Sequence, residues 1–357
     1  MSQPIGPSDA PSDPACRDCG SATSLVHEGL RDRHFDSGAR PGDGADGWKL
    51  RRCDACAMHW LSPRPAGDEL AALYGEYYTH DAVEPSGFEA WLKRAVPAAV
   101  LGYSQAASGF DRLLARAITS LGPMRVLGEI GRAAAMWLPA PGPGQNRLLD
   151  VGCGSGLLLA RMRSMGWDIA GVEPDASGAQ AARQRLPGAE IFSDIADAPA
   201  AAFDAIVSSH VVEHLADPQV TLSGCLRALK PGGRIVISTP NPTSAGAARF
   251  GSSWLHWDPP RHLQLFGSSN LAALLERVGF SDVRTETSAG SAHFAYYASS
   301  VIERDAVMPG LRLGALSLST RLSGLRFWMS EHARVRRGDP CGEELVAFAS
   351  RPTAATE

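Results

Sequence analysis

The chain has 357 residues, of which 44% are hydrophobic and 20% charged, so it has enough apolar material for a core and disorder is excluded for most of it. A formal net charge of −4 gives no global basic field, which argues against nucleic-acid binding as the main role. No apolar run reaches the roughly 18 residues of a spanning helix, and the N-terminus lacks the pattern of a secretion signal. We therefore expect a globular cytoplasmic protein without a membrane span.

The N-terminal part of the chain contains two Cys-x-x-Cys pairs. Residues 1–14 are rich in Pro, Ser and Asp and are expected to form a disordered tail. Residues 15–62 follow, with short strands and turns around Cys16, Cys19, Cys53 and Cys56. Four thiolates are the ligand set of structural zinc sites, so we predict a zinc-ribbon-like segment that holds one structural Zn²⁺. Redox-active or unrelated thiols are the alternative.

Residues 63–145 are predicted to form a helical linker or cap. The apolar residues from Phe110 to Leu121 recur at i, i+3, i+4 and i+7, with Arg112 and Arg116 on the opposite face, which predicts an amphipathic helix. Four residues are expected to divide the region into short helices: Pro97, Gly102, Gly122 and Pro123.

From residue 146 to 357 strands alternate with helices, which predicts βαβ units and a parallel sheet, an α/β fold. The expected strands are 148–151, 169–172, 191–192, 205–208 and 234–238, and the expected helices are 157–165, 176–186 and 218–229. Ser268 or Ser269 should cap a further helix that ends at Val278 before Gly279. Two later strands, 283–287 and 345–349, flank a helical insertion at about 290–340.

A glycine-rich loop, Asp150-Val-Gly-Cys-Gly-Ser-Gly156, follows the first of these strands. Its G-x-G-x-G pattern differs from the dinucleotide fingerprint, and an aspartate at the strand end would repel a pyrophosphate. Glu173, at the end of the second strand, could accept hydrogen bonds from both hydroxyls of a ribose. Asp194 could receive an adenine amine, and Ile195 could cover a purine face.

Together with the segments Phe203–Leu215 and Leu229–Arg234, this pattern resembles the class I S-adenosylmethionine-dependent methyltransferases over roughly residues 147–240. The resemblance implies a Rossmann-like seven-stranded sheet whose last strand is antiparallel, and Leu345–Ala349 fits that strand. It also implies S-adenosylmethionine as cofactor. The residues it assigns to cofactor binding are Asp150, Gly152, Cys153, Gly154, Gly156, Glu173, Asp194, Ile195 and His210.

The candidate catalytic residues follow the fourth and fifth strands. We predict His214 as a general base, with Glu213 orienting a group or binding a metal; alternatively both residues begin and cap the next helix. His262 is the second candidate, because loops at the carboxyl edge of an α/β sheet gather substrate chemistry. It could act as base or, with Arg261, bind an anionic acceptor; alternatively His262 satisfies backbone groups while Trp254 anchors the loop.

The segments Trp60–Pro65, Leu73–Tyr78 and Pro260-Arg-His-Leu263 are similar to those of a methyltransferase subgroup with a preceding zinc-ribbon-like knuckle. Some members of that subgroup act on sugars or other small metabolites. The resemblance thus implies methyl transfer to O, N or C of a small molecule, such as a sugar or secondary metabolite. We expect no nucleic-acid partner, because no basic stripe surrounds the cysteines. The alternative is a zinc-ribbon module that binds protein or nucleic acid on a methyltransferase-like scaffold. The sequence does not predict the oligomeric state.

Overall fold

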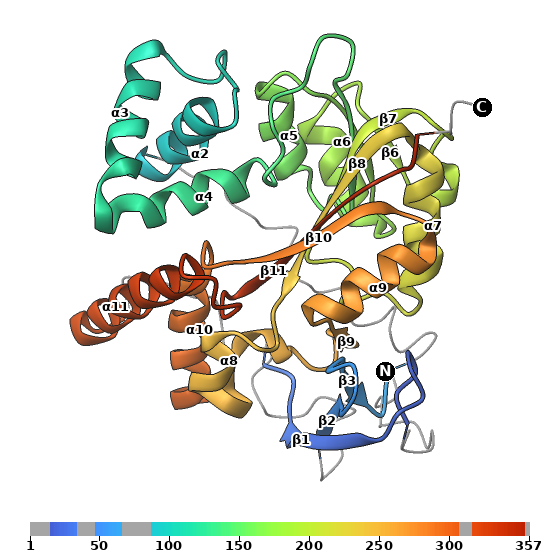
Figure 1. Ribbon diagram of the computed structural model, residues 1–357, viewed down its shortest axis with the longest axis vertical. Helices are drawn as coiled ribbons and strands as arrows, with labels where there is room; N and C mark the ends of the chain where they lie inside the picture. Colours follow the sequence, from blue (N-terminus) through green and yellow to red (C-terminus); the bar gives the residue numbers. More distant parts are fainter. Residues whose placement is uncertain (1–14, 34–46, 66–86, 307–315, 354–357) are drawn as a thin grey trace.

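The computed structural model describes residues 15–33, 47–65, 87–306 and 316–353. The predicted tail 1–14 and the aromatic stretch Leu73–Tyr78 lie outside these residues. A seven-stranded sheet crosses the molecule in the order β10-β11-β8-β7-β4-β5-β6 (Figure 1). Its strands are β4 (Arg147–Val151), β5 (Asp168–Val172), β6 (Glu190–Phe192), β7 (Phe203–Ser209), β8 (Leu229–Pro240), β10 (Ser281–Ser288) and β11 (Glu344–Ser350).

The strand directions confirm the predicted α/β fold with an antiparallel last strand. The β4, β5, β6, β7 and β8 strands pair in parallel, whereas β11 is antiparallel to both β8 and β10. Because β11 runs the other way, its first residue, Glu344, pairs with Pro240 at the carboxyl end of β8. The start of the last strand therefore lies at the edge where the parallel strands end.

Helices cover both faces of this sheet. Leu148 and Val207 pack into a core with α5 (Leu157–Ser164) and α6 (Ala176–Arg185). Their chain neighbours Leu149 and Ile206 pack on the opposite face, with α7 (Pro218–Ala228) and α9 (Ser268–Val278). This alternation of successive side chains between two cores explains why the strands are apolar at almost every position.

Additional helices extend from one side of the sheet (Figure 1). They are α2 (Gly87–Val100), α3 (Gly109–Ser120), η2 (Gly122–Arg125), α4 (Val126–Ala134), α8 (Ala245–Phe250), α10 (Ala292–Asp305) and α11 (Leu318–Val335). The short helical turns are η3 (Ile195–Asp197), η4 (Gly251–Ser253) and η5 (Leu255–Trp257). None of the helices in the described ranges is long and apolar enough to cross a membrane.

Three local expectations are corrected. The predicted amphipathic helix exists as α3, but its apolar face is not buried: Phe110 is 74% exposed and Ala115 is the helix's one buried residue among those described. Pro97 lies inside α2 and does not divide it. The N-cap of α9 is Gly267, without a side-chain cap, whereas Gly279 ends the helix at φ 107° as predicted.

The N-terminal segment forms a second, small sheet in the order β1-β2-β3-β9. Its strands are β1 (Thr23–Leu30), β2 (Trp48–Cys53), β3 (His59–Ser62) and β9 (Gln264–Leu265). The last of these belongs to the loop that follows β8, and His59 pairs with Leu265. Trp254 and Trp257 from that loop pack with Leu50 and Leu61. The four-cysteine segment and the loop over the carboxyl edge of the large sheet therefore share a sheet and a core.

Candidate active site

The glycine loop leaves β4 with three left-handed residues: φ is 78° at Gly152, 52° at Gly154 and 78° at Gly156. Such angles favour glycine because they strain other residues. A Cβ on Gly152 would come within 2.4 Å of the Val211 side chain, whereas one on Gly154 would meet nothing within 4 Å. The loop therefore packs closely against Val211 at Gly152, whereas the space beside Gly154 is open. A ligand can approach the backbone at Gly154.

Glu173 contacts the backbone at this opening, and Asp150 is a buried acid near Glu173. Glu173 accepts hydrogen bonds from the backbone N–H of Gly154 (2.7 Å) and of Asp175 (3.0 Å). A carboxylate has about four acceptor positions, so Glu173 retains capacity for ribose hydroxyls. Asp150 is 2% exposed, and burial together with the nearby Glu173 raises its pKa to about 7. The glycine loop and its acidic neighbours fit an S-adenosylmethionine molecule.

Three other residues predicted to contact the cofactor have side chains that are buried or hydrogen-bonded within the protein: Asp194, Ile195 and Cys153. Asp194 caps η3 by accepting from the N–H of Ala196 at 2.7 Å. Ile195 is 8% exposed and packs against Gly224 of α7, which leaves little of it to cover a purine. The thiol of Cys153 faces the core beneath Gly171, so the loop offers a ligand the backbone of Cys153 rather than its sulfur.

His210 lies between two carboxylates. Its Nδ1 is 3.3 Å from Glu213, and its Nε2 is 3.7 Å from Glu344. Burial lowers the pKa of His210, but the hydrogen bonds and charges of the two acids outweigh burial and raise it to about 10. Burial raises the pKa of Glu213, and the bond from His210 outweighs this and lowers it to about 2. His210 is therefore a cation and Glu213 an anion at neutral pH.

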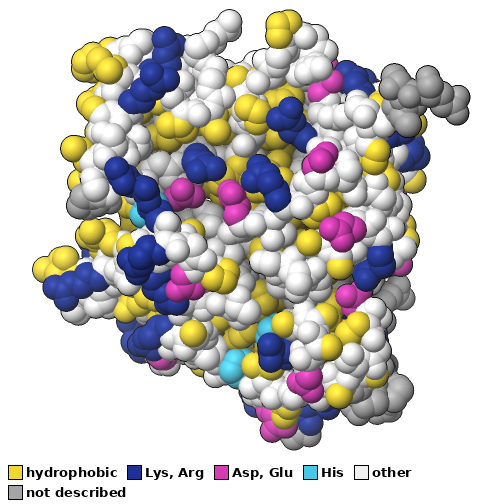
Figure 2. Space-filling view, in the orientation of Figure 1, with side chains coloured by type: hydrophobic (Ala, Val, Ile, Leu, Met, Phe, Trp, Pro, Cys, Tyr) yellow, Lys and Arg dark blue, Asp and Glu magenta, His cyan; other side chains and the backbone are white. Residues whose placement is uncertain are grey.

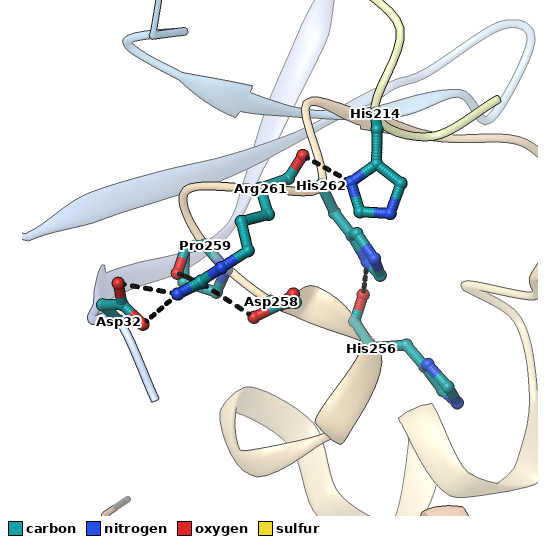
Figure 3. Close-up of polar contacts among 7 residues, drawn as sticks. All are labelled: Asp32, His214, His256, Asp258, Pro259, Arg261 and His262. Carbon is teal, nitrogen blue, oxygen red and sulfur yellow. Dashed lines mark hydrogen bonds and ion pairs between the residues drawn. The ribbon is translucent and has the colours of Figure 1, made fainter. Parts of the chain in front are cut away.

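His214 and His262 come from different loops and meet with ring centroids 4.7 Å apart, in a T-shaped arrangement (Figure 3). His214 Nδ1 lies 3.1 Å from the carbonyl oxygen of Arg261, and His262 Nδ1 lies 2.7 Å from that of His256. A carbonyl only accepts, so Nδ1 carries the proton in both rings. In the neutral rings the lone pair is then on Nε2.

Burial and the neighbouring His262 lower the pKa of His214 to about 4. His214 is therefore neutral at physiological pH and carries its lone pair on Nε2. Beside it, the carboxylate of Glu213 has no exposed surface and accepts from the Thr239 hydroxyl at 2.9 Å. The arrangement combines two oriented imidazoles with one fixed anion.

The alternative assignment of Glu213 and His214 to a helix cap is wrong. The next helix, α7, begins at Pro218 and is capped by Asp217, whose carboxylate accepts from Gln219 and Val220. The alternative assignment of the second loop is confirmed in its details: His262 binds a backbone carbonyl, and Trp254 is fully buried with its N–H bound to Glu343 at 2.9 Å. These anchoring contacts are what bring His262 to His214.

Arg261 does not face an acceptor site, which corrects its predicted role in anion binding. The residue is fully buried. Its Nη2 atom donates to both carboxylate oxygens of Asp32, at 2.7 and 2.8 Å, and its Nη1 donates to Asp258 at 3.2 Å (Figure 3). The positive charge of Arg261 is therefore neutralised by Asp32 and Asp258 within the protein.

Two groups of side chains have the composition of metal sites. The ligand atoms of Glu213, His214 and His262 all lie within 4.8 Å of one another. Their imidazoles donate Nδ1–H to carbonyls, as metal-ligating histidines generally do. The second group is Cys16, Cys19, Cys53 and Cys56, also within 4.8 Å of one another.

The cysteine group fits a tetrahedral zinc site. Sulfur atoms are 3.7 Å apart in Cys16 and Cys56 and 3.5 Å apart in Cys19 and Cys53. Hydrogen bonds from Ser21 and from Cys53 lower the pKa of Cys19 to about 6, whereas burial raises the pKa values of Cys16 and Cys56. Because all four sulfur atoms lie within 4.8 Å of one another, the cluster is compatible with structural Zn²⁺.

Two residues of this site were not singled out from the sequence. Glu344 reaches His210 because β11 is antiparallel, and its only signal is a pair of acids directly before an apolar strand. His256 lies 5.9 Å from His210, ring centroid to centroid, and its carbonyl holds His262. Figure 2 shows histidine side chains at the surface just above the N-terminal sheet, with arginine and acidic residues beside them.

Comparison with known proteins agrees with this geometry. The model of a methyltransferase domain family matches residues 110–285. The ubiquinone biosynthesis O-methyltransferase of Cereibacter sphaeroides is 40% identical over 140 residues, which cover 34% of this chain and 54% of that protein. The protein of the same description from Dinoroseobacter shibae is 34% identical over 180 residues, which cover 44% of this chain and 68% of that protein. The chain thus spans about half the length of the first curated relatives it matches, 54% in the Cereibacter protein.

Among solved structures, phosphoethanolamine N-methyltransferase 2 of Haemonchus contortus in complex with S-adenosyl-L-methionine is similar with a TM-score of 0.41. Its identity is 20%, over 63% of this chain and 57% of that chain.

A doubly wound sheet with a glycine loop after β4 and an acid after β5 is the arrangement typical of nucleoside-binding α/β proteins. Combined with the sequence matches, the family is clear. The chain belongs to the class I S-adenosylmethionine-dependent methyltransferases. This family agrees with the predicted enzyme class and with S-adenosylmethionine as the predicted cofactor.

Proposed function

We propose that the protein transfers a methyl group from S-adenosylmethionine to a hydroxyl oxygen of a small molecule, such as a sugar or secondary metabolite. The observation that carries the proposal is the meeting of His214, His262 and Glu213 at the carboxyl edge of the sheet that also bears the glycine loop. Relatives named as O-methyltransferases favour oxygen over nitrogen or carbon as the acceptor atom.

The residues divide into two groups by role. Glu173 and the backbone around Gly154 bind and orient the donor, which when bound supplies a methyl group already activated on a sulfonium. His214 Nε2 accepts the proton of the acceptor hydroxyl as the new bond forms. His262 packs against the ring of His214 and limits its rotation, and the anion of Glu213 stabilises the imidazolium that results. Closeness and exclusion of water supply the remaining acceleration.

A second arrangement of the same residues is supported by the ligand-atom distances. Glu213, His214 and His262 would together hold a divalent cation, which lowers the pKa of a bound hydroxyl and replaces the general base. The two arrangements differ in their response to chelators. A metal-dependent reaction stops when the cation is removed, whereas a reaction with His214 as base continues.

We infer in addition that the four cysteines hold a structural Zn²⁺ and that the N-terminal segment is a zinc ribbon. Support comes from the convergence of the four sulfur atoms and from the β3–β9 pairing that joins the segment to the active-site loop. A closed four-thiolate site leaves no position for a catalytic water, so its role is structural.

A labelled-donor screen tests the proposed function. The protein is incubated with donor carrying an isotopically labelled methyl group and pools of hydroxylated, amino and carbon-acid small molecules, and products are found by mass. Labelled product is expected from a hydroxylated pool. Label only on amino or carbon acceptors would contradict the oxygen assignment. Parallel reactions with and without a chelator separate a general base from a bound cation.

A further inference from the structure

We propose that Asp32 and Arg261 are positioning residues, whose ion pair holds the loop that orients His214 for the methyl transfer proposed above. The catalytic role of this ion pair rests on the proposed function, whereas its effect on the orientation of the His214 ring depends on the fold alone. Asp32 belongs to the N-terminal segment, directly after β1, and lies 229 positions before Arg261. The N-terminal segment thus acts on the active site from outside the methyltransferase domain.

The ion pair is a rigid connection. The side chain of Arg261 is 1% exposed and that of Asp32 is 4% exposed. One nitrogen of the guanidinium, Nη2, lies 2.7 and 2.8 Å from the two oxygens of the Asp32 carboxylate, a charge-assisted contact that holds this end of the side chain. Asp258 binds the other end of the guanidinium at 3.2 Å. If Arg261 moved away from either acid, a buried carboxylate would be left without a counter-charge, which is energetically costly.

The backbone of Arg261 links the ion pair to His214 and His262. Its carbonyl oxygen is the partner of His214 Nδ1 at 3.1 Å, so the direction of that carbonyl decides which nitrogen of His214 holds the proton (Figure 3). The next residue is His262, and the N–H of Leu263 donates to the carbonyl of Glu213 at 2.9 Å. The loop also contains Asp258 at φ 29°, an angle that is strained outside glycine and needs support from its surroundings.

The chain offers a matched control. Arg277 of α9 also forms an ion pair with the N-terminal segment, through Asp18, but it contacts neither histidine loop in any described hydrogen bond. A role in merely attaching the segment to the domain would be shared by both ion pairs. Of these two ion pairs, the one between Asp32 and Arg261 is the pair whose arginine also contacts His214.

Asp32→Asn and Arg261→Lys test the proposal in the full-length protein. Asn keeps the shape of Asp but removes the charge, and Lys keeps the charge but has one nitrogen where Arg261 uses Nη2 for Asp32 and Nη1 for Asp258. The readout is the pair of imidazole nitrogen-15 shifts of His214, assigned with His214→Gln, because these shifts report the tautomer. We expect wild type and Arg277→Gln to hold the proton on Nδ1, and both test variants to show a mixture of tautomers.

The kinetic counterpart is a fall of at least about 10-fold in single-turnover methyl transfer, with donor affinity within about twofold of wild type. Asp32→Glu, which restores the charge, should recover part of the rate. Unchanged His214 shifts in a folded test variant, with only a lower melting temperature, would overturn the proposal. If Asp32→Asn does not fold, the shifts of Arg261→Lys and Asp32→Glu decide. A wild type that holds the Nδ1 tautomer but transfers no methyl group would contradict the proposed function and leave the positioning intact.

Discussion

The Nδ1 atom of His210 lies 3.3 Å from the carboxylate of Glu213, which has no exposed surface. Burial opposes the charge on His210, but Glu213 and Glu344 raise its pKa to about 10. A pKa raised above the unfolded value of 6.5 stabilises the fold fully below that value, and the contribution is lost as pH rises through about 10.

His210→Gln should therefore lower the free energy of unfolding at about pH 7 by about 1 kcal/mol, a figure reduced because the ring is partly exposed. The difference from wild type should shrink above about pH 10, as measured by urea unfolding at both pH values. A difference that stays the same at both would contradict the ionic role of His210.

A second pH effect comes from a buried acid on α11. Glu331 is 1% exposed, and burial together with Glu343 raises its pKa to about 9. The native state then holds a proton that the unfolded state releases above the ordinary value of 4.5, so stability falls as pH rises from about 4.5 to about 9.

Glu331→Gln should remove this cost while its side-chain oxygen still accepts from the Glu343 N–H, a contact of 2.9 Å in the native protein. We expect a gain of about 1 to 3 kcal/mol at about pH 8 and little change at about pH 4. The exposed Glu276 provides the control substitution, Glu276→Gln. If the two substitutions changed the free energy of unfolding at pH 8 equally, this would argue against a buried proton on Glu331.

Donor affinity should depend on Glu173. Its carboxylate fixes the glycine loop through Gly154 and is available to ribose hydroxyls. Glu173→Ala should weaken binding of S-adenosylmethionine by about 1.5 to 3 kcal/mol, since a charged acceptor is removed. Calorimetry measures this directly. Glu190→Ala, at an exposed acid of the neighbouring strand β6, should leave affinity unchanged; a similar loss in both would show that the effect is not specific.

Metal removal should act first on the small sheet. Purified protein is expected to contain about one zinc per chain, because the four sulfur atoms form a single closed set. A strong chelator, or Cys53→Ser, should increase hydrogen exchange in β2, β3 and β9 before it affects β7 of the large sheet. Cys341→Ser serves as control, since this thiol is outside the cluster. Zinc well below one equivalent with exchange unaffected by chelation would refute the zinc ribbon.

Much of the fold followed from local patterns, because apolar runs such as 148–151 and 169–172 end in turns that lead into helices. The periodicity of α3 predicted its helix correctly but not its burial, since a pattern defines a face without saying what covers it. Phe110 is accordingly exposed.

Part of the active site could also be predicted from local sequence patterns. Residues that follow parallel strands, such as Glu173 and His214, gather at one edge whenever the sheet forms. The contribution of Glu344 depends on an antiparallel strand and is marked in the sequence only by a pair of acids beside that strand. The contribution of Asp32 depends on a pairing across 229 positions, which leaves no local signal.

The most direct test of the account is labelled methyl transfer by His214→Ala, compared with wild type on the hydroxylated acceptor found in the screen. The account predicts a fall in single-turnover rate of about 10²- to 10⁴-fold, with donor affinity and melting temperature close to wild type. His262→Ala should lose less, because its Nδ1 is held by the loop itself and its ring serves to pack against His214. A His214→Ala protein that binds the donor and transfers the methyl group at the wild-type rate would contradict the proposed site.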